Sequence, residues 1–249
     1  MPTHVPYITI PEDLPTHTAI LNGAPHFQNI FAISTEISAD WVQTAYQRGL
    51  FPWYSAGEPV LWHSPNPRMV LSLDHFNCSP SLKKRLKQWA RSPAHDMRVT
   101  LNHAFEHVIN TCAQTPRDGQ DGTWITPELR QAYIDLHHQQ HAVSVEVWHG
   151  DQLVAGLYGV LIGRMFFGES MFTRITDGSK VALACWVEYL RQEGFKIIDC
   201  QQENQHLTRL GGSPISRAQF FSESAQLMQH APIDWAKMAA QDNLLSFYI

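Results

Sequence analysis

Two polar residues near the end of a predicted strand have the spacing of side chains that could act together. Residues 195–200 are expected to form a strand, and Asp199 and Gln201 lie two positions apart at its end. Because side chains alternate along a strand, residues two apart face the same side. A carboxylate and an amide on one face can position and polarise a reacting group. From spacing alone, however, a solvated strand end is the simpler interpretation.

Glu169 is a carboxylate within an apolar stretch. It follows Gly168 and lies between the apolar pairs at 166–167 and 171–172, which include three phenylalanines. Burying a carboxylate in such surroundings is costly without a partner. A surface turn is the alternative, but the three phenylalanines favour a functional role, such as holding a cationic amine.

Residues 51–54 and 62–68 combine aromatic side chains with prolines. Proline restricts the backbone, and the aromatic rings provide flat apolar faces. Trp53, and further along the chain Trp124, are candidates for stacking on a planar ligand group. From the sequence alone, a buried structural role for these two tryptophans is an equally good interpretation.

A predicted helix at residues 81–91 carries five cations in a chain whose formal net charge is −5. They are Lys83, Lys84, Arg85, Lys87 and Arg91. The overall acidity argues against indiscriminate nucleic-acid binding, so a phosphate contact would be local to this helix. A solvated helix face is the usual alternative.

The periodicity of the chain predicts an α+β fold with a mixed β-sheet flanked by helices. Residues 1–35 are expected to form loops and short edges. Helices are predicted at 39–48, 81–91, 102–112, 127–140 and 179–192, with another near 203. Strands are predicted at 69–73, 97–101, 144–148, 152–163, 164–172 and 195–200, with a hairpin turn at 149–151. Ser38 and Thr126 are candidate helix caps, and Gly49 is a candidate helix stop.

The composition indicates an ordered protein, with 44% hydrophobic and 16% charged residues. The chain has neither a membrane-length apolar run nor a signal-peptide profile, so we expect a soluble, cytoplasmic protein that does not contact membranes. Its four scattered cysteines predict reduced thiols. Its histidines, including His137 and His141 on one predicted helix face, are expected to be exposed and to bind no metal.

Several short motifs together resemble one family. They are YQRGLFPW at 46–53, WHSPNPR at 62–68, DGTWIT at 121–126, HAVSVEVW at 141–148, GESMF at 168–172 and IDCQ at 198–201. The order of these motifs, which continues to about residue 220, is similar to that of the leucyl/phenylalanyl-tRNA-protein transferases.

The resemblance implies a small N-terminal domain at 1–66 and a GNAT-like N-acyltransferase domain at 67–249. It implies transfer of leucine, phenylalanine or, as a further candidate, methionine from aminoacyl-tRNA to proteins that begin with Arg or Lys. The product would be marked for N-end rule degradation. No R-x-x-G-x-G/A loop for coenzyme A is found in the sequence, and no cofactor is expected.

The resemblance also implies roles for individual residues. Gln201 would accept a hydrogen bond from the attacking amine, Asp199 would orient and polarise that amine, and Glu169 would hold a cationic amino group. Trp53 and Trp124 would stack on the 3′-terminal adenosine, and the basic helix would contact tRNA phosphates. The aminoacyl pocket would be lined by Leu157, Phe166, Met171, Leu183, Trp186 and Ile198, each of which could equally belong to the core.

The chain departs from the family pattern at residues 31–38 and at 202–204, where Gln-Glu-Asn replaces an expected aliphatic pair. Acceptor contacts at 202–204 are therefore expected to differ. The sequence is also compatible with two other functions. One is a coenzyme A-dependent N-acetyltransferase, and the other is a tRNA-binding protein without catalysis.

Overall fold

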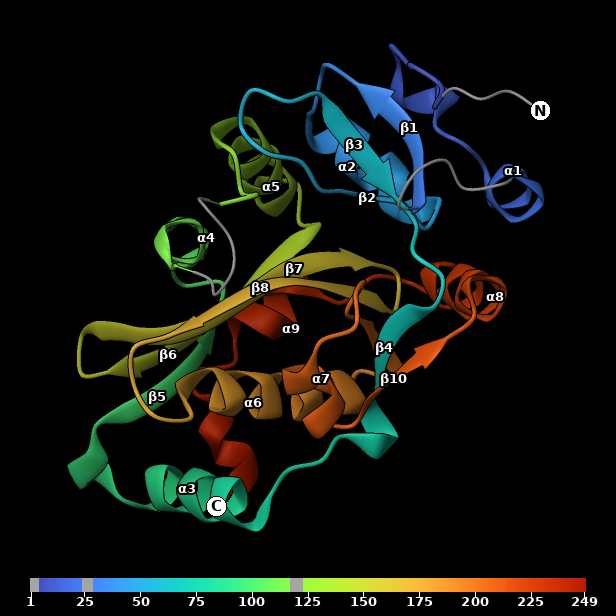
Figure 1. The fold of residues 1–249 in the computed structure, drawn as a ribbon. Coiled ribbons are helices and arrows are strands. Elements are labelled where there is room, and N and C mark those ends of the chain that lie inside the picture. Colours follow the sequence, from blue (N-terminus) through green and yellow to red (C-terminus); the bar gives the residue numbers. More distant parts are fainter. Residues whose placement is uncertain (1–4, 24–28, 117–122) are drawn as a thin grey trace.

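Two β-sheets organise the chain in the computed structural model, which describes residues 5–23, 29–116 and 123–249 (Figure 1). A three-stranded sheet has the order β1-β3-β2, and a seven-stranded sheet has the order β10-β4-β9-β8-β7-β6-β5. The strands are β1 (Ile30–Ser34), β2 (Phe51–Pro52), β3 (Val60–His63), β4 (Arg68–Ser72), β5 (Met97–Leu101), β6 (Ala142–His149), β7 (Gln152–Ile162), β8 (Met165–Thr173), β9 (Ile197–Asp199) and β10 (Gly212–Ile215). Because β8 and β9 are parallel and the other pairs antiparallel, the larger sheet is mixed, as predicted.

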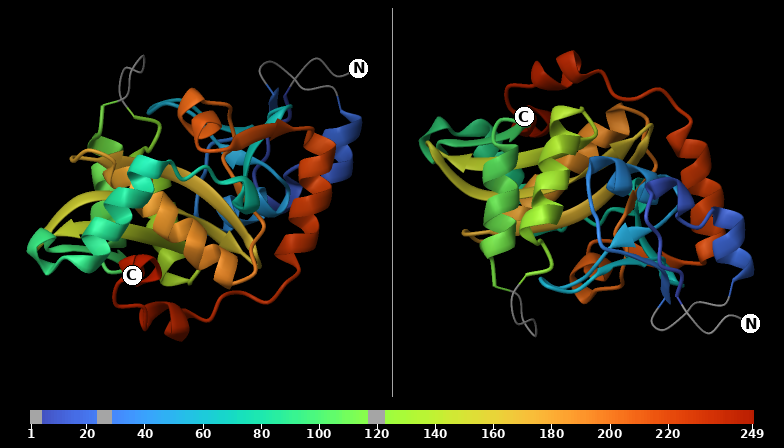
Figure 2. Two further views of the ribbon diagram at one scale, coloured as in Figure 1. Left: turned by 90° about the horizontal axis from the view of Figure 1, so that it is seen from below. Right: turned by 90° about the horizontal axis from the view of Figure 1, so that it is seen from above.

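Helices cover both faces of the larger sheet. The α-helices are α1 (His17–Asn22), α2 (Ala39–Gln47), α3 (Pro80–Arg91), α4 (Phe105–Gln114), α5 (Pro127–His138), α6 (Gly178–Gln192), α7 (Gln205–Arg209), α8 (Arg217–Met228) and α9 (Trp235–Ala239). In Figure 1, α4 and α5 lie above the sheet and α6 lies below it, with α3 further down. The two views of Figure 2 show these opposite layers from below and from above.

Alternating side chains along the strands produce two hydrophobic cores. Leu157 and Phe166 face the layer of α6, whereas their neighbours Tyr158 and Phe167 face the layer of α4, α5 and the N-terminal region. This is the period of two expected of a strand with both faces covered. The predicted α+β architecture, with a mixed sheet flanked by helices, is confirmed.

The structure tests the predicted helix ends and the predicted loops of the N-terminal region. Thr126 caps α5 by accepting a hydrogen bond from the Leu129 amide, and Gly49 follows α2 with φ of 70°. Ser38 precedes α2, but its side chain makes no capping hydrogen bond. Residues 1–35 were expected to form only loops and short edges, yet the described part of this region contains the helix α1. That helix is short, with Ile20 as its buried residue, so the sequence carries no sustained period there.

A β-bulge in β8 coincides with the candidate carboxylate. Tyr158 of β7 pairs with Ser170, whereas the next residue, Gly159, pairs with Gly168, so Glu169 is the extra residue. A bulge of this kind re-aims a side chain out of the regular alternation. Opposite the bulge, a Cβ on Gly159 would lie 2.2 Å from the Phe167 carbonyl oxygen, so the close approach requires glycine.

β8 and β9 are paired over a short length only. Their register joins Phe166 to Ile198 and Phe167 to Asp199, and no pair follows. Beyond Phe167, no strand of the described residues pairs with β8 on this edge. The opening between β8 and the chain that follows β9 contains the candidate site.

The division at residue 66 stays a prediction. The strands of the smaller sheet come from residues 30–63, and those of the larger sheet begin at Arg68. One hydrophobic core nevertheless spans both parts, since Tyr46 and Trp62 belong to the same cluster as Phe167 and Phe220. Within the described residues, no helix has the length and apolar character needed to cross a membrane.

Candidate active site

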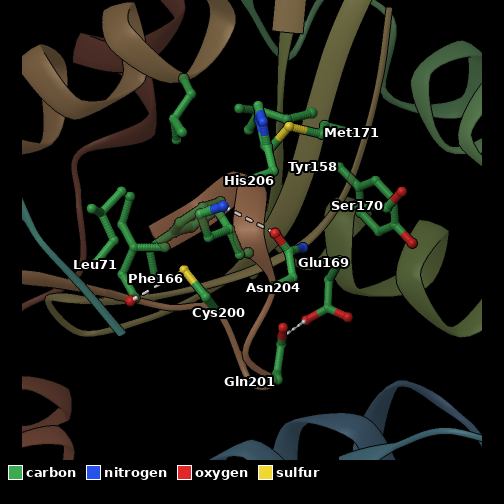
Figure 3. A pocket seen from close by; sticks show the side chains of 15 residues that line it. Leu71, Tyr158, Phe166, Glu169, Ser170, Met171, Cys200, Gln201, Asn204 and His206 are labelled. Atoms are coloured by element: carbon green, nitrogen blue, oxygen red, sulfur yellow. Dashed lines mark hydrogen bonds between the residues drawn. The ribbon is translucent and has the colours of Figure 1, made fainter. Parts of the chain in front are cut away.

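Glu169 lies at the centre of a group of hydrogen-bond donors. The hydroxyls of Tyr46 and Tyr133 donate to Glu169 Oε1 and Oε2 at 2.5 and 2.8 Å. The Gln201 side-chain amide donates to Oε1 at 3.1 Å, an interaction drawn in Figure 3. The donors come from α2, α5 and the loop after β9, so the bulge brings the carboxylate to the meeting point of three segments.

The surroundings shift the protonation equilibria of these groups. Burial raises the pKa of Glu169 to about 7, although the hydrogen bonds from the two tyrosines oppose that shift. Burial and the nearby Glu169 raise the pKa of both Tyr46 and Tyr133 well above the usual range. The tyrosines are therefore neutral donors at physiological pH, whereas Glu169 can gain or lose a proton near pH 7.

Asp199 forms a fully buried ion pair instead of facing the cavity. Arg68 Nε and Nη2 donate to its two carboxylate oxygens at 2.8 and 2.6 Å, and both side chains are 0% exposed. The Arg68 guanidinium lies between the rings of Phe51 and Phe220, at 4.9 and 4.5 Å from their centroids. A third donor, Nη1, reaches the Gly49 carbonyl oxygen at 3.2 Å. Asp199 is thus enclosed by its partners within the protein.

The predicted shared orientation of Asp199 and Gln201 is wrong. β9 ends at Asp199, and Gln201 has a left-handed backbone conformation with φ of 55°. The Gln201 backbone N–H donates to Asp199 Oδ1 at 3.0 Å. Asp199 therefore holds the backbone turn that presents the Gln201 side chain to Glu169. The alternation rule failed because it applies only while the chain stays in a strand.

An apolar cavity of about 310 Å³ opens beside Glu169. Its walls include five of the six predicted pocket residues, namely Leu157, Phe166, Met171, Leu183 and Ile198, and its polar side includes Glu169, Gln201, Asn204 and His206 (Figure 3). Trp186 does not line it. That side chain is fully buried on α6, where it packs edge-on against Phe166 at 5.1 Å between centroids, so it supports the wall from behind.

A second cavity, of about 250 Å³, contains both candidate stacking residues. Trp53 and Trp124 line it together with Phe51, Pro52 and Gln202, and it shares Glu169, Cys200, Gln201 and Asn204 with the apolar cavity. We call it the tryptophan cavity. Trp53 is 38% exposed, so part of its indole is accessible to a ligand. Glu169 and Gln201 therefore stand where the two cavities meet.

The five cations of the predicted basic helix lie on α3 but do not all face solvent. Lys83, Lys84, Lys87 and Arg91 line one open surface hollow. Arg85 instead points toward the start of α6, where it pairs with Asp177 at 3.2 Å. α3 lies beyond α6 in Figure 1, so a ligand that touches both α3 and the tryptophan cavity has to be an extended molecule.

The Cys200 thiol and the His137 ring are both partly buried. Burial raises the pKa of the Cys200 thiol, so it is not a thiolate nucleophile. His137, expected to be exposed, is partly buried because its ring stacks on Phe105 at 4.2 Å. Across the described ranges, no group of three or more His, Cys, Asp or Glu residues could hold a metal ion.

Three residues that hold Glu169 or Asp199 by hydrogen bonds were not predicted from the sequence. Tyr46 and Arg68 lie inside the quoted motifs at 46–53 and 62–68, but nothing in their spacing points to Glu169 or Asp199. Tyr133 reads only as a buried helix residue. Their partners lie 36 to 131 positions away along the chain, so only the folded structure brings them together.

The two adjoining cavities and the titratable carboxylate between them define a site that can hold two reactants around one polar junction, as group transfer requires. A family model described as "Leucyl/phenylalanyl-tRNA protein transferase" matches residues 70–225, and the model of that family's N-terminal domain matches residues 35–66. Proteins named leucyl/phenylalanyl-tRNA–protein transferase from Burkholderia multivorans and Burkholderia cenocepacia are each 46% identical over 231 residues, covering 93% of this chain and 90% of theirs. The chain belongs to the leucyl/phenylalanyl-tRNA protein transferase family, which is a family of aminoacyltransferases.

Among solved structures the likenesses are distant. L-PGS from Bacillus licheniformis has a TM-score of 0.38 at 10% identity, covering 85% of this chain and 64% of that one. A GCN5-related N-acetyltransferase from Kribbella flavida has a TM-score of 0.31 at 11% identity, covering 74% of this chain and 64% of that one. The family assignment does not depend on either of them.

Proposed function

We propose that the chain transfers leucine, phenylalanine or methionine from aminoacyl-tRNA to the N-terminal amino group of an acceptor protein. The observation that carries this proposal is the junction at Glu169 and Gln201, with an apolar cavity on one side and two tryptophans on the other. The apolar cavity takes the side chain of the donor amino acid. Such a cavity discriminates by only about 1–3 kcal/mol per methylene, which fits a small set of apolar donors.

The residues at the junction divide the chemistry between them. The Gln201 Nε2 group is occupied by Glu169, so its Oε1 is the atom available to accept a hydrogen bond from the attacking amine. Glu169 attracts the ammonium form of that amine and takes up its proton. Asp199 does not touch the substrate and is a positioning residue.

The proposed reaction is a single acyl transfer. The amine nitrogen attacks the ester carbonyl carbon, the C–N bond forms and the C–O bond to the terminal ribose breaks. Starting from the ammonium form, the nitrogen loses two protons. One passes through Glu169 to the ribose oxygen of the departing tRNA, and the other is released to water. An α-amino group has a pKa of about 8, so a nearby acceptor near pH 7 gives access to the neutral nucleophile.

The tRNA is proposed to bind through two separate regions. Its terminal adenosine stacks in the tryptophan cavity, and its phosphates contact Lys83, Lys84, Lys87 and Arg91 on α3. Arg85, also predicted to contact phosphates, is engaged with Asp177 and contributes less. The acceptors are proteins that begin with Arg or Lys, and the product is marked for N-end rule degradation.

Replacing Trp53 or Trp124 by alanine is expected to weaken aminoacyl-tRNA binding. Stacking on a base contributes about 1–3 kcal/mol, so each variant should raise the KM for Phe-tRNA by about five-fold to 150-fold while kcat changes little. Steady-state transfer assays measure both constants. Trp235→Ala, which lies on α9 away from the cavities, is the matched control. An unchanged KM in both cavity variants would remove the stacking role.

The experiment that tests the function follows labelled phenylalanine from Phe-tRNA into an acceptor peptide that begins with Arg. Label in acid-stable peptide is expected, and RNase treatment or a blocked acceptor amine should abolish it. Binding of tRNA without transfer would instead favour a non-catalytic tRNA-binding protein. Acetyl transfer from acetyl-CoA to the same peptide would favour a coenzyme A-dependent enzyme.

A further inference from the structure

A third cavity adjoins the tryptophan cavity. It has a volume of about 420 Å³ and is lined in part by His63, Pro65, Asn66 and Pro67, from the motif at 62–68. We call it the outer cavity. It shares Trp53, Gln202 and Glu203 with the tryptophan cavity, which in turn shares Glu169 and Gln201 with the apolar cavity. The proposed function gives occupants to the apolar and tryptophan cavities and leaves the outer cavity without one.

Glu203 is the one carboxylate among the described residues that line the outer cavity. Its side chain is exposed, and in the described part of the chain no Lys, Arg or His forms an ion pair with it. The acidic side chains Asp177, Glu188 and Glu193 all have cationic partners by contrast. Glu203 thus provides an available negative charge in a hollow that opens toward the reacting centre.

The amide side chains of the outer cavity are held in place by Arg217. Its Nη2 donates to Asn29 Oδ1 at 3.0 Å, and its backbone N–H donates to Asn66 Oδ1 at 3.0 Å. Each carbonyl oxygen therefore accepts a hydrogen bond from Arg217, whereas Glu203 carries a full negative charge. The rest of the wall includes rigid proline rings and part of the Trp53 indole.

The position of Glu203 relative to Gln201 links it to the acceptor. The two residues lie two positions apart in the short segment between β9 and α7, and both line the tryptophan cavity with Glu169. When the α-amino group of the acceptor lies at Glu169 and Gln201, the side chain of the acceptor's first residue extends from the neighbouring α-carbon. A long side chain that passes Trp53 enters the outer cavity and ends near Glu203.

We propose that the outer cavity binds the first side chain of the acceptor and that Glu203 pairs with its positive charge. This inference rests on the proposed function, which it extends by naming the residue that selects a cationic acceptor. A guanidinium is favoured over an ammonium because it is planar and donates two hydrogen bonds to one carboxylate. Since Glu203 is exposed, the preference weakens as ionic strength rises.

The test compares peptides that begin with Arg or with citrulline, which has nearly the same shape and no charge. Calorimetric titration of the two peptides without tRNA measures binding, and transfer assays measure kcat/KM. Hydrogen bonds to charged groups contribute about 1.5–3 kcal/mol, so Glu203→Gln should weaken binding of the Arg peptide by about ten-fold to 150-fold. Binding of the citrulline peptide should be unchanged by this substitution. Glu203→Lys should reverse the preference toward peptides that begin with Glu.

Glu36→Gln is the matched control, because Glu36 is an exposed carboxylate that lines a separate surface hollow. Unfolding midpoints confirm that each variant is folded. If Glu203→Gln keeps the wild-type ratio of Arg to citrulline binding, the inference is overturned whether or not transfer occurs. If the wild-type protein binds the Arg peptide through Glu203 but transfers nothing, the inference holds and the proposed function fails.

Discussion

Replacing Arg68 by methionine is expected to lower the free energy of unfolding by about 3–5 kcal/mol, because it leaves the fully buried Asp199 carboxylate without a cation. Asp199→Leu should have an effect of similar size, since it leaves the Arg68 guanidinium unpaired between two phenylalanine rings. Either loss is a large fraction of the stability of an ordinary domain. Urea unfolding curves of the two variants and the wild type measure it.

The double variant separates stability from positioning. With both charges removed, Arg68→Met with Asp199→Leu leaves no unpaired ion and should recover most of the lost stability. It cannot restore the acceptor for the Gln201 backbone N–H, so Gln201 loses its fixed position. We expect kcat to stay at least about ten-fold below wild type while the KM for aminoacyl-tRNA is unchanged. A double variant with wild-type kcat would show that the ion pair serves the fold alone.

Replacing Glu169 by glutamine is expected to reduce kcat/KM by about 100-fold or more, because general acid–base groups typically contribute factors of 10² to 10⁴. The substitution keeps the shape of the side chain and removes its ability to take up a proton. The wild-type rate should rise with pH through an ionisation near 7, and the variant should lack that step. Rate profiles between pH 5.5 and 9 compare the two. An ionisation near 7 that persists in the variant would assign the proton to another group.

The same substitution is expected to stabilise the folded protein at alkaline pH. The pKa of Glu169 is raised from 4.5 to about 7, so the folded state retains a proton that the unfolded chain has released. The stabilisation is complete below about pH 4.5 and is lost as the pH rises through 7. A shift of this size corresponds to at most about 3 kcal/mol, and because Glu169 is only partly shielded we expect less. Glu169→Gln should therefore unfold at higher urea than wild type at pH 8 and at the same urea near pH 4.

Glu146 provides the matched control for both effects. It is a second buried glutamate whose pKa burial raises to about 7, and its oxygens accept hydrogen bonds from Thr100 and Ser144. It lines neither cavity at the junction. Glu146→Gln should give a similar gain in stability at pH 8 with transfer unchanged. If both glutamines reduced transfer equally, the loss would reflect the fold and not the site.

The sequence by itself determined the class of fold and most of its elements. Hydrophobic periodicity located the strand Met97–Leu101 and the helices from Pro127 and Gly178, because a period of two or of 3.6 is a local property of the chain. The motifs identified the family, and the resemblance to that family named five of the side chains that form one apolar wall. Trp186 was misplaced because an apolar residue has the same signature beside a cavity as behind one.

Only the tertiary structure decided how the polar groups are paired. A one-residue bulge turns Glu169 toward Tyr46 and Tyr133, and the end of β9 at Asp199 separates that carboxylate from Gln201. Arg68 encloses the carboxylate of Asp199, which contacts Arg68 and the Gln201 backbone and lines neither cavity. These arrangements depend on contacts between distant segments and on a strand register that a single residue changes. The sequence states which polar groups are present, and the packing of the folded chain determines which of them line the cavities.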